Sequence, residues 1–147
     1  MCIIIDINIA ERIVLRTEDA DFKELSECLW GRRRPLVRMA YGGDLLREYQ
    51  ANGRLMAALE ALDRAGRAVK YPEESLRQET KSVKLLGLCR SNDHHIIALA
   101  RVSQTRLLCS RDRDLCADFK NKRLLDKPRG KIYKNGSHMN LLIAHCP

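Results

Sequence analysis

The sequence has 147 residues, of which 45% are hydrophobic and 31% charged, and it carries a net charge of +8. This length fits a single domain over residues 1–147, and no apolar run reaches the roughly 20 residues needed to cross a bilayer. The first residues lack the basic start of a signal peptide, and Asp6 interrupts their apolar run, so we expect a cytoplasmic protein without membrane contact. The excess of Lys and Arg attracts polyanions, and nucleic acid is the first partner to consider.

The cysteines carry no metal or redox signature, because no two of them are spaced as Cys-x-x-Cys. Most of them lie in apolar surroundings. We therefore expect buried free thiols in a reducing compartment. The six are Cys2, Cys28, Cys89, Cys109, Cys116 and Cys146.

Strands and helices are expected to alternate along the chain. The isoleucines at 3–5 are typical of a strand that is buried on both faces and ends at Asp6. A short helix or turn should follow at 9–15. Further strands are expected at 36–41, 69–71, 106–110 and 131–133, and helices at 21–30, 45–49, 54–64, 73–86, 94–102 and 115–121. Asp44 is expected to cap the helix at 45–49. This order indicates an α/β fold with a mainly parallel central sheet.

Parallel sheets bind ligands outside the carboxyl ends of their strands, and four acidic residues are expected near that edge. Asp6 and Asp112 come at or just past strand ends, Asp93 begins a helix, and Glu48 lies one turn into the helix after the second strand. Carboxylates that share a cleft repel one another, and a divalent cation removes that repulsion. Oxygen ligands suit Mg²⁺ or Mn²⁺, which can activate water and neutralise a phosphoryl transition state. Inside a basic protein, such a set predicts a nuclease.

The order and context of these acids resemble those of the PIN-domain proteins, a nuclease family that includes the VapC-like bacterial toxins. The resemblance covers nearly the whole chain and rests on four segments. These are the strand with Asp-x-Asn at 3–8, the helix start with its Glu at 42–48, the Asp and alanine-containing helix at 92–100, and the strand with Ser-x-Asp-x-Asp at 107–115. It implies a three-layer α/β/α fold and a Mg²⁺- or Mn²⁺-dependent endoribonuclease that cleaves single-stranded RNA. A toxin role, an antitoxin partner and homodimerisation are further family properties.

The resemblance also implies a role for each matching residue. Catalysis and metal binding would fall to Asp6, Glu48, Asp93 and Asp112, with Asp114 as a further ligand, direct or through water. Asn8 and Ser110 would orient these groups, and Arg111 and Arg113 would contact the substrate.

Some assignments stay open in the sequence. Asp44 is an alternative to Glu48, and Asp114 competes with Asp112 for the fourth position. Gly42 stands where the family often has Ser. Of His94 and His95, at most one can face the site, because neighbouring helical residues point about 100° apart.

Two other functions also fit the sequence. The chain could be a non-catalytic nucleic-acid-binding protein with the same fold, in which the acids serve as helix caps. It could also be a phosphotransfer protein that uses Asp6 or Asp112 as the phosphoacceptor.

Overall fold

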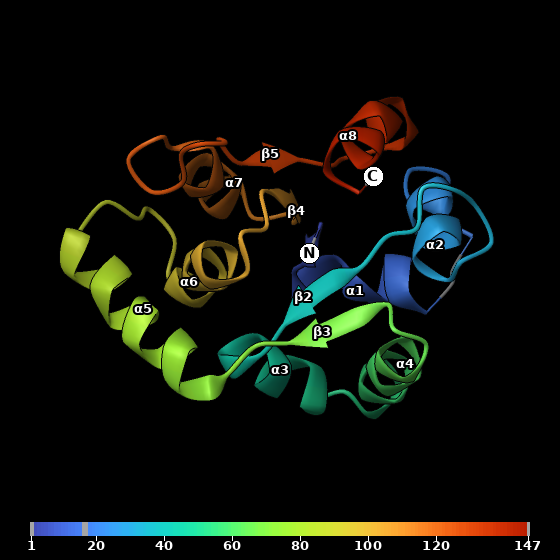
Figure 1. The fold of residues 1–147 in the computed structure, drawn as a ribbon, viewed down its shortest axis with the longest axis horizontal. Coiled ribbons are helices and arrows are strands. Elements are labelled where there is room, and N and C mark those ends of the chain that lie inside the picture. Colours follow the sequence, from blue (N-terminus) through green and yellow to red (C-terminus); the bar gives the residue numbers. More distant parts are fainter. Residues whose placement is uncertain (1, 16–17, 147) are drawn as a thin grey trace.

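The computed structural model describes residues 2–15 and 18–146, and their strands are short and parallel (Figure 1). One sheet has the order β1-β4-β5, and β2 pairs with β3 in a second. A parallel bridge between Ile3 and Met39 links the two, and the Ala40 N–H donates to the Ile3 carbonyl. The spatial order is therefore β3-β2-β1-β4-β5. The strands are β1 Ile4–Ile5, β2 Met39–Tyr41, β3 Ala68–Lys70, β4 Leu107–Cys109 and β5 Lys131–Ile132.

The direction in which the sheet grows reverses at β1. The chain adds β2 and β3 on one side of β1, and then β4 and β5 on the other. Ile5 at the end of β1 pairs with Cys109 at the end of β4. Open parallel sheets bind ligands outside the carboxyl ends of the strands at such a reversal. The next residues, Asp6 and Ser110, lie at this point.

Helices surround the strands. Helices α5 and α6 pack against each other on one side of the molecule, while α8 lies beside α2 on the other (Figure 1). The expected α/β architecture with parallel strands is confirmed. In the described residues the helices are α1 Ile7–Val14, α2 Lys23–Leu29, α3 Gly43–Gln50, α4 Gly53–Arg64, α5 Glu73–Leu86, α6 His94–Ser103, α7 Arg113–Lys120, the 3-10 helix η1 Gly136–His138 and α8 Met139–His145.

The turn between β2 and α3 depends on Gly42. Its φ of +145° lies in a region that favours glycine, and a Cβ there would lie 2.8 Å from Leu76 Cδ1 and 2.9 Å from the Tyr71 carbonyl oxygen. A serine at this position would therefore clash. The turn starts α3 directly after β2 and so sets the position of Glu48.

Several sequence expectations need correction. The second strand begins at Met39, and Asp44 lies in the first turn of α3, because Gly42 occupies the position before the helix. No helix was predicted at 139–145, where α8 forms. Its amphipathic pattern is short, and its buried Leu142 becomes informative only once the helix packs on α2.

The cysteine prediction was wrong for two residues. Cys2 and Cys146 form a disulfide across 144 positions, so the two ends of the described chain lie together. Their wide separation hid the pairing. The free thiols are Cys28, Cys89, Cys109 and Cys116. In the described part of the chain, no helix has the length and apolar character needed to cross a membrane.

Candidate metal centre

The Asp6 carboxylate lies at the sheet reversal and is only 4% exposed. Its Oδ2 accepts a hydrogen bond of 2.6 Å from the Ser110 hydroxyl. The Asp6 backbone N–H donates to the Cys109 carbonyl, which continues the pairing of β1 with β4. The two strands therefore hold this carboxylate in place.

The Ser110 hydroxyl links the segment after β1 to the segment after β4. Besides donating to Asp6, it accepts from the Asn8 side-chain amide at 3.4 Å and from the Asp112 backbone N–H at 3.1 Å. The Asn8 carbonyl oxygen in turn accepts from the Arg111 N–H at 3.2 Å. Asn8 and Ser110 thus have the contacts that an orienting role needs.

Asp112 caps α7. Its Oδ1 accepts from the backbone N–H groups of Asp114 at 2.9 Å and Leu115 at 3.1 Å. A cap of this kind satisfies N–H groups that have no partner within the helix. The predicted helix at 115–121 therefore begins earlier, at Arg113.

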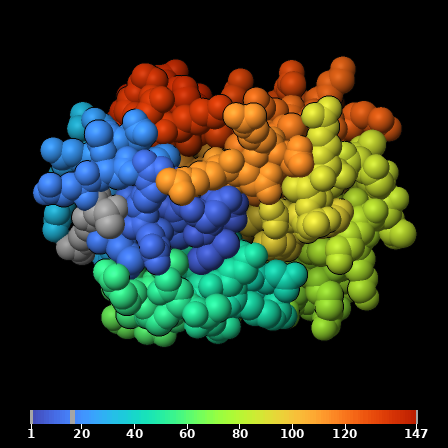
Figure 2. All heavy atoms as spheres, turned by 180° about the vertical axis from the view of Figure 1, so that it is seen from behind, coloured from blue at the N-terminus to red at the C-terminus, as the bar shows by residue number. Residues whose placement is uncertain are grey.

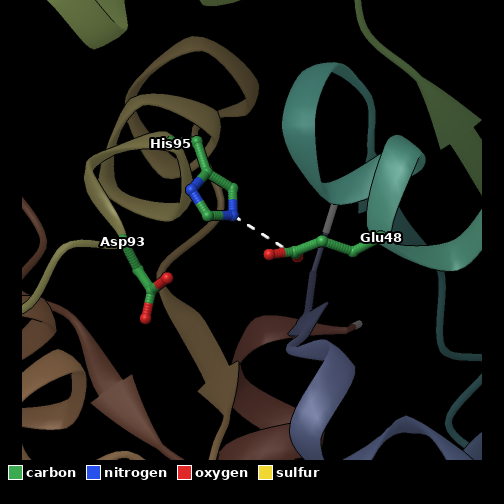
Figure 3. A group of neighbouring side chains, drawn as sticks. All are labelled: Glu48, Asp93 and His95. Carbon is green, nitrogen blue, oxygen red and sulfur yellow. Dashed lines mark ion pairs between the residues drawn. The ribbon is translucent and has the colours of Figure 1, made fainter. Parts of the chain in front are cut away.

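Glu48, Asp93 and His95 form a close group (Figure 3). One ligand atom from each lies within 4.8 Å of the others, and His95 Nε2 is 3.5 Å from Glu48 Oε2. Glu48 comes from α3, whereas Asp93 and His95 come from the start of α6. The buried Tyr49 hydroxyl, next to Glu48, donates to the Ile5 carbonyl at 2.9 Å and holds α3 against β1.

The acids around Ser110 (Asp6 and Asp112) and the acids beside His95 (Glu48 and Asp93) act on one another electrostatically. Burial raises the pKa of Asp6, and the charges of Asp93 and Glu48 raise it further, although the Ser110 hydrogen bond opposes this. Burial also raises the pKa of Asp93; His95 lowers it, and Asp112 and Glu48 raise it. These carboxylates therefore share one field, in which an added cation would be stabilised.

His95 is the histidine of the pair that faces this group. Burial lowers its pKa, but the Glu48 and Asp93 carboxylates outweigh that effect and leave the pKa above the ordinary value. The neighbouring His94 is outside the close group, and its Nδ1 lies 3.2 Å from the Asn92 carbonyl oxygen. The sequence predicted that at most one of the two would face the site and left open which.

The other predicted site residues lie on the surface, outside the group of Glu48, Asp93 and His95. Asp44 is exposed and forms an ion pair with Arg47 at 2.7 Å, so Glu48 and not Asp44 joins the acid group. The side chains of Arg111, Arg113 and Asp114 are exposed at the start of α7. In Figure 2 the amino-terminal segment, the α3 segment and the segment around 110–120 adjoin one another on the surface.

Sequence reasoning missed the residues that hold the segment 90–93 just before α6, which we call the Asp93 loop. Asp118 on α7 is 1% exposed and accepts from the backbone N–H groups of Arg90 at 2.8 Å and Ser91 at 3.0 Å. The Ser91 hydroxyl donates to Asp118 at 2.9 Å and accepts from the Asp93 N–H at 3.2 Å. The spacing of 27 residues between Ser91 and Asp118 gave no signal in the sequence.

The donor set fits a divalent cation. Glu48 Oε2 and His95 Nε2 are both buried, and among the described residues neither has a hydrogen-bond partner. Buried polar atoms are rarely left in that condition. A cation beside Glu48 and Asp93 would satisfy these atoms and offset the repulsion between the acids.

We compared the chain with protein-family models, curated protein sequences and solved structures, and none of the three comparisons found a significant match.

Proposed function

We propose that the protein is a metal-dependent endoribonuclease that hydrolyses phosphodiester bonds of single-stranded RNA. The observation that carries the proposal is the gathering of acids beside the sheet reversal, where Ser110 bonds the Asp6 carboxylate and the Asp112 N–H, and Glu48 lies close to Asp93. Four carboxylates without a cation repel one another, which is unfavourable unless the arrangement serves a ligand. The three-layer arrangement implied by the family resemblance belongs to the same proposal.

The carboxylates would hold Mg²⁺ or Mn²⁺, which when bound supplies an activated water and neutralises charge on the phosphate. Ser110, which bonds the Asp6 carboxylate and the Asp112 backbone N–H and accepts from Asn8, would orient these acids. Asp114, in the first turn of α7, would bind through a water. These residues would thus provide oxygen ligands before the substrate arrives.

The basic side chains would bind the RNA backbone. Arg111 and Arg113 are exposed next to Asp112, where they can reach phosphates on either side of the cleaved bond. The net charge of +8 favours approach of a polyanion even though the site itself is acidic. Recognition would then rest on phosphate charge.

Cleavage of a labelled single-stranded RNA by the purified protein tests the proposal. Cleavage is expected with Mg²⁺ or Mn²⁺ and should stop with EDTA, while Asp6→Asn and Asp93→Asn should each lose at least roughly a hundredfold in rate. Asp126→Asn removes an exposed acid outside the group and is the matched control. The proposal fails if the wild type cuts no RNA under these conditions, or if Asp6→Asn cuts equally well.

One observation favours a second candidate, a nucleic-acid-binding protein without catalysis. The Asp112 carboxylate already caps α7, and Asp6 already accepts a hydrogen bond from Ser110. Acids that already accept hydrogen bonds within the fold do not require a cation. RNA binding that survives EDTA, with no cleavage, would support this alternative.

The toxin role, the antitoxin partner, homodimerisation and the cytoplasmic location complete the proposal, and they rest on the family resemblance and the sequence. The disulfide between Cys2 and Cys146 takes away the support that the cysteines gave to a reducing compartment. Expression with and without a neighbouring small gene, scored by growth, tests the toxin role.

A further inference from the structure

We propose that His95 supplies a nitrogen ligand to the divalent cation held by Glu48 and Asp93. The site would then be a mixed nitrogen–oxygen centre that takes Mn²⁺, Co²⁺ or Zn²⁺ in preference to Mg²⁺. The inference rests on the proposed function in using the same acids, but it concerns the cation and not the RNA reaction. The family resemblance implied only oxygen ligands.

The separation of the donor atoms supports this role. Two ligands bonded to one ion at about 2.1 Å lie about 3.0 Å apart at a right angle and about 3.4 Å apart at the tetrahedral angle. His95 Nε2 and Glu48 Oε2 are 3.5 Å apart, close to the tetrahedral value. One ligand atom from each of Glu48, Asp93 and His95 lies within 4.8 Å of the other two, so Asp93 stands beside the pair as a third donor.

The two facing atoms lack the hydrogen bond that a simple ion pair would form. Charged N–H···O bonds are about 2.7–2.9 Å long. At 3.5 Å the His95–Glu48 contact is longer, and within the described residues both atoms are buried without a hydrogen-bond partner (Figure 3). An ion between them would satisfy both at once.

The chemistry of the imidazole gives the metal preference. Carboxylates suit Mg²⁺ and Mn²⁺, whereas a neutral imidazole nitrogen favours transition metals and adds little to Mg²⁺ binding. Replacing His95 should therefore weaken Co²⁺ and Zn²⁺ binding much more than Mg²⁺ binding. An all-oxygen site would show no such difference.

Electron spin-echo spectroscopy of Mn²⁺ on the wild-type protein is the direct test, because it detects a nitrogen bonded to the ion without any RNA or turnover. We expect a nitrogen modulation that changes when the protein carries ¹⁵N-labelled histidine and disappears in His95→Gln. His94→Gln, which alters the neighbouring imidazole outside the close group, should keep it. Isothermal titration should show roughly a tenfold or greater loss of Co²⁺ affinity in His95→Gln and a much smaller loss for Mg²⁺.

The outcomes separate this inference from the proposed function. Mn²⁺ bound to the wild type without nitrogen modulation would overturn the inference, whether or not RNA is cut. A modulation that persists in His95→Gln would also overturn it, because another histidine would then be the ligand. A histidine-dependent modulation in a protein that cuts no RNA would support the inference while the proposed function fails.

Discussion

The Ser110 hydroxyl donates a 2.6 Å hydrogen bond to the Asp6 carboxylate, although the two residues lie 104 positions apart in the chain. The bond crosses from the end of β1 to the end of β4, at the reversal of the sheet. It connects the most buried acid of the candidate site to the segment that carries Asp112. The chemistry of the site therefore depends on the pairing of these two strands.

Ser110→Ala should lower both metal affinity and RNA cleavage. The change removes the bond to Asp6 and the acceptor for the Asn8 amide and the Asp112 N–H, so the carboxylates lose their orientation. We expect a loss of about 10–100-fold in each property, measured by titration calorimetry and by kcat/KM. Ser82→Ala, on the exposed face of α5, is the control and should leave both unchanged. Equal metal affinity and activity of the two variants would show that Ser110 does not orient the carboxylates.

Asp6→Asn should stabilise the metal-free protein at neutral pH while it abolishes cleavage. Because burial raises the folded pKa of Asp6 above its ordinary value, ionised Asp6 costs stability above the folded pKa. That cost declines as the pH falls through the folded pKa, and it is gone below the unfolded value. Asparagine removes the charge but still accepts from Ser110.

Urea unfolding in EDTA measures this effect. We expect Asp6→Asn to be more stable than wild type at pH 7 by on the order of 1 kcal/mol, with the difference shrinking as the pH approaches 4. A variant less stable than wild type, or a difference independent of pH, would show that Asp6 is not destabilised by its surroundings.

Reduction of the Cys2–Cys146 disulfide should destabilise the protein strongly. The bond closes a loop with a sequence separation of 144, and the chain-entropy model gives about 4–5 kcal/mol for loops of this size. Thermal unfolding with and without a reductant measures the loss. Cys146→Ser should be as unstable as the reduced wild type and insensitive to the reductant. Cys89→Ser, which removes a free thiol, should respond to reductant as wild type does.

Lys81 and Lys84 should contribute to RNA binding. They line a groove of about 200 Å³ between α3 and α5 that His95 also lines, so an RNA strand in the groove would reach the metal centre. Arg47 in the same groove is paired with Asp44 and Glu73, which leaves the lysines to contact phosphates. The double Gln variant should weaken binding and reduce the salt slope by about one for each lost phosphate contact.

The control for the groove is Lys23→Gln, which changes a lysine on α2 that lines a separate hollow. Filter binding over a range of salt concentrations gives the slope for each variant. If the double variant and the control have the same slope, the RNA does not pass through the groove.

Asp118→Asn should weaken metal binding through the Asp93 loop. The buried carboxylate accepts from two backbone N–H groups and from the Ser91 hydroxyl, and an amide offers one acceptor oxygen where the carboxylate has two. We expect a loss of about 1–3 kcal/mol in stability, together with weaker Mn²⁺ binding. Comparison with a destabilising core variant on another helix, such as Leu62→Val in α4, separates the loss of stability from the loss of metal binding. Equal Mn²⁺ affinity of the two variants would show that Asp118 does not position Asp93 for metal binding.

Local patterns in the sequence predicted most of the helices. Helix α5 was predicted at its observed bounds because Pro72 suits the start of a helix. In the structure Gly87 ends this helix at a φ of +63°. Strand lengths were less accurate, since hydrogen bonding to a neighbour decides where a strand ends. The residues of 36–38 continue the apolar pattern but lie outside β2.

What the sequence alone determined was a set of candidate acids, most of them at the ends of strands or the starts of helices, because neighbouring residues mark those ends. Only the tertiary structure decided which of them meet. It brought Glu48 rather than Asp44 to Asp93, because the turn at Gly42 sets the direction of α3. It also placed His95 in the group and Asp118 behind the Asp93 loop, since contacts between distant segments leave no periodic signal in the chain.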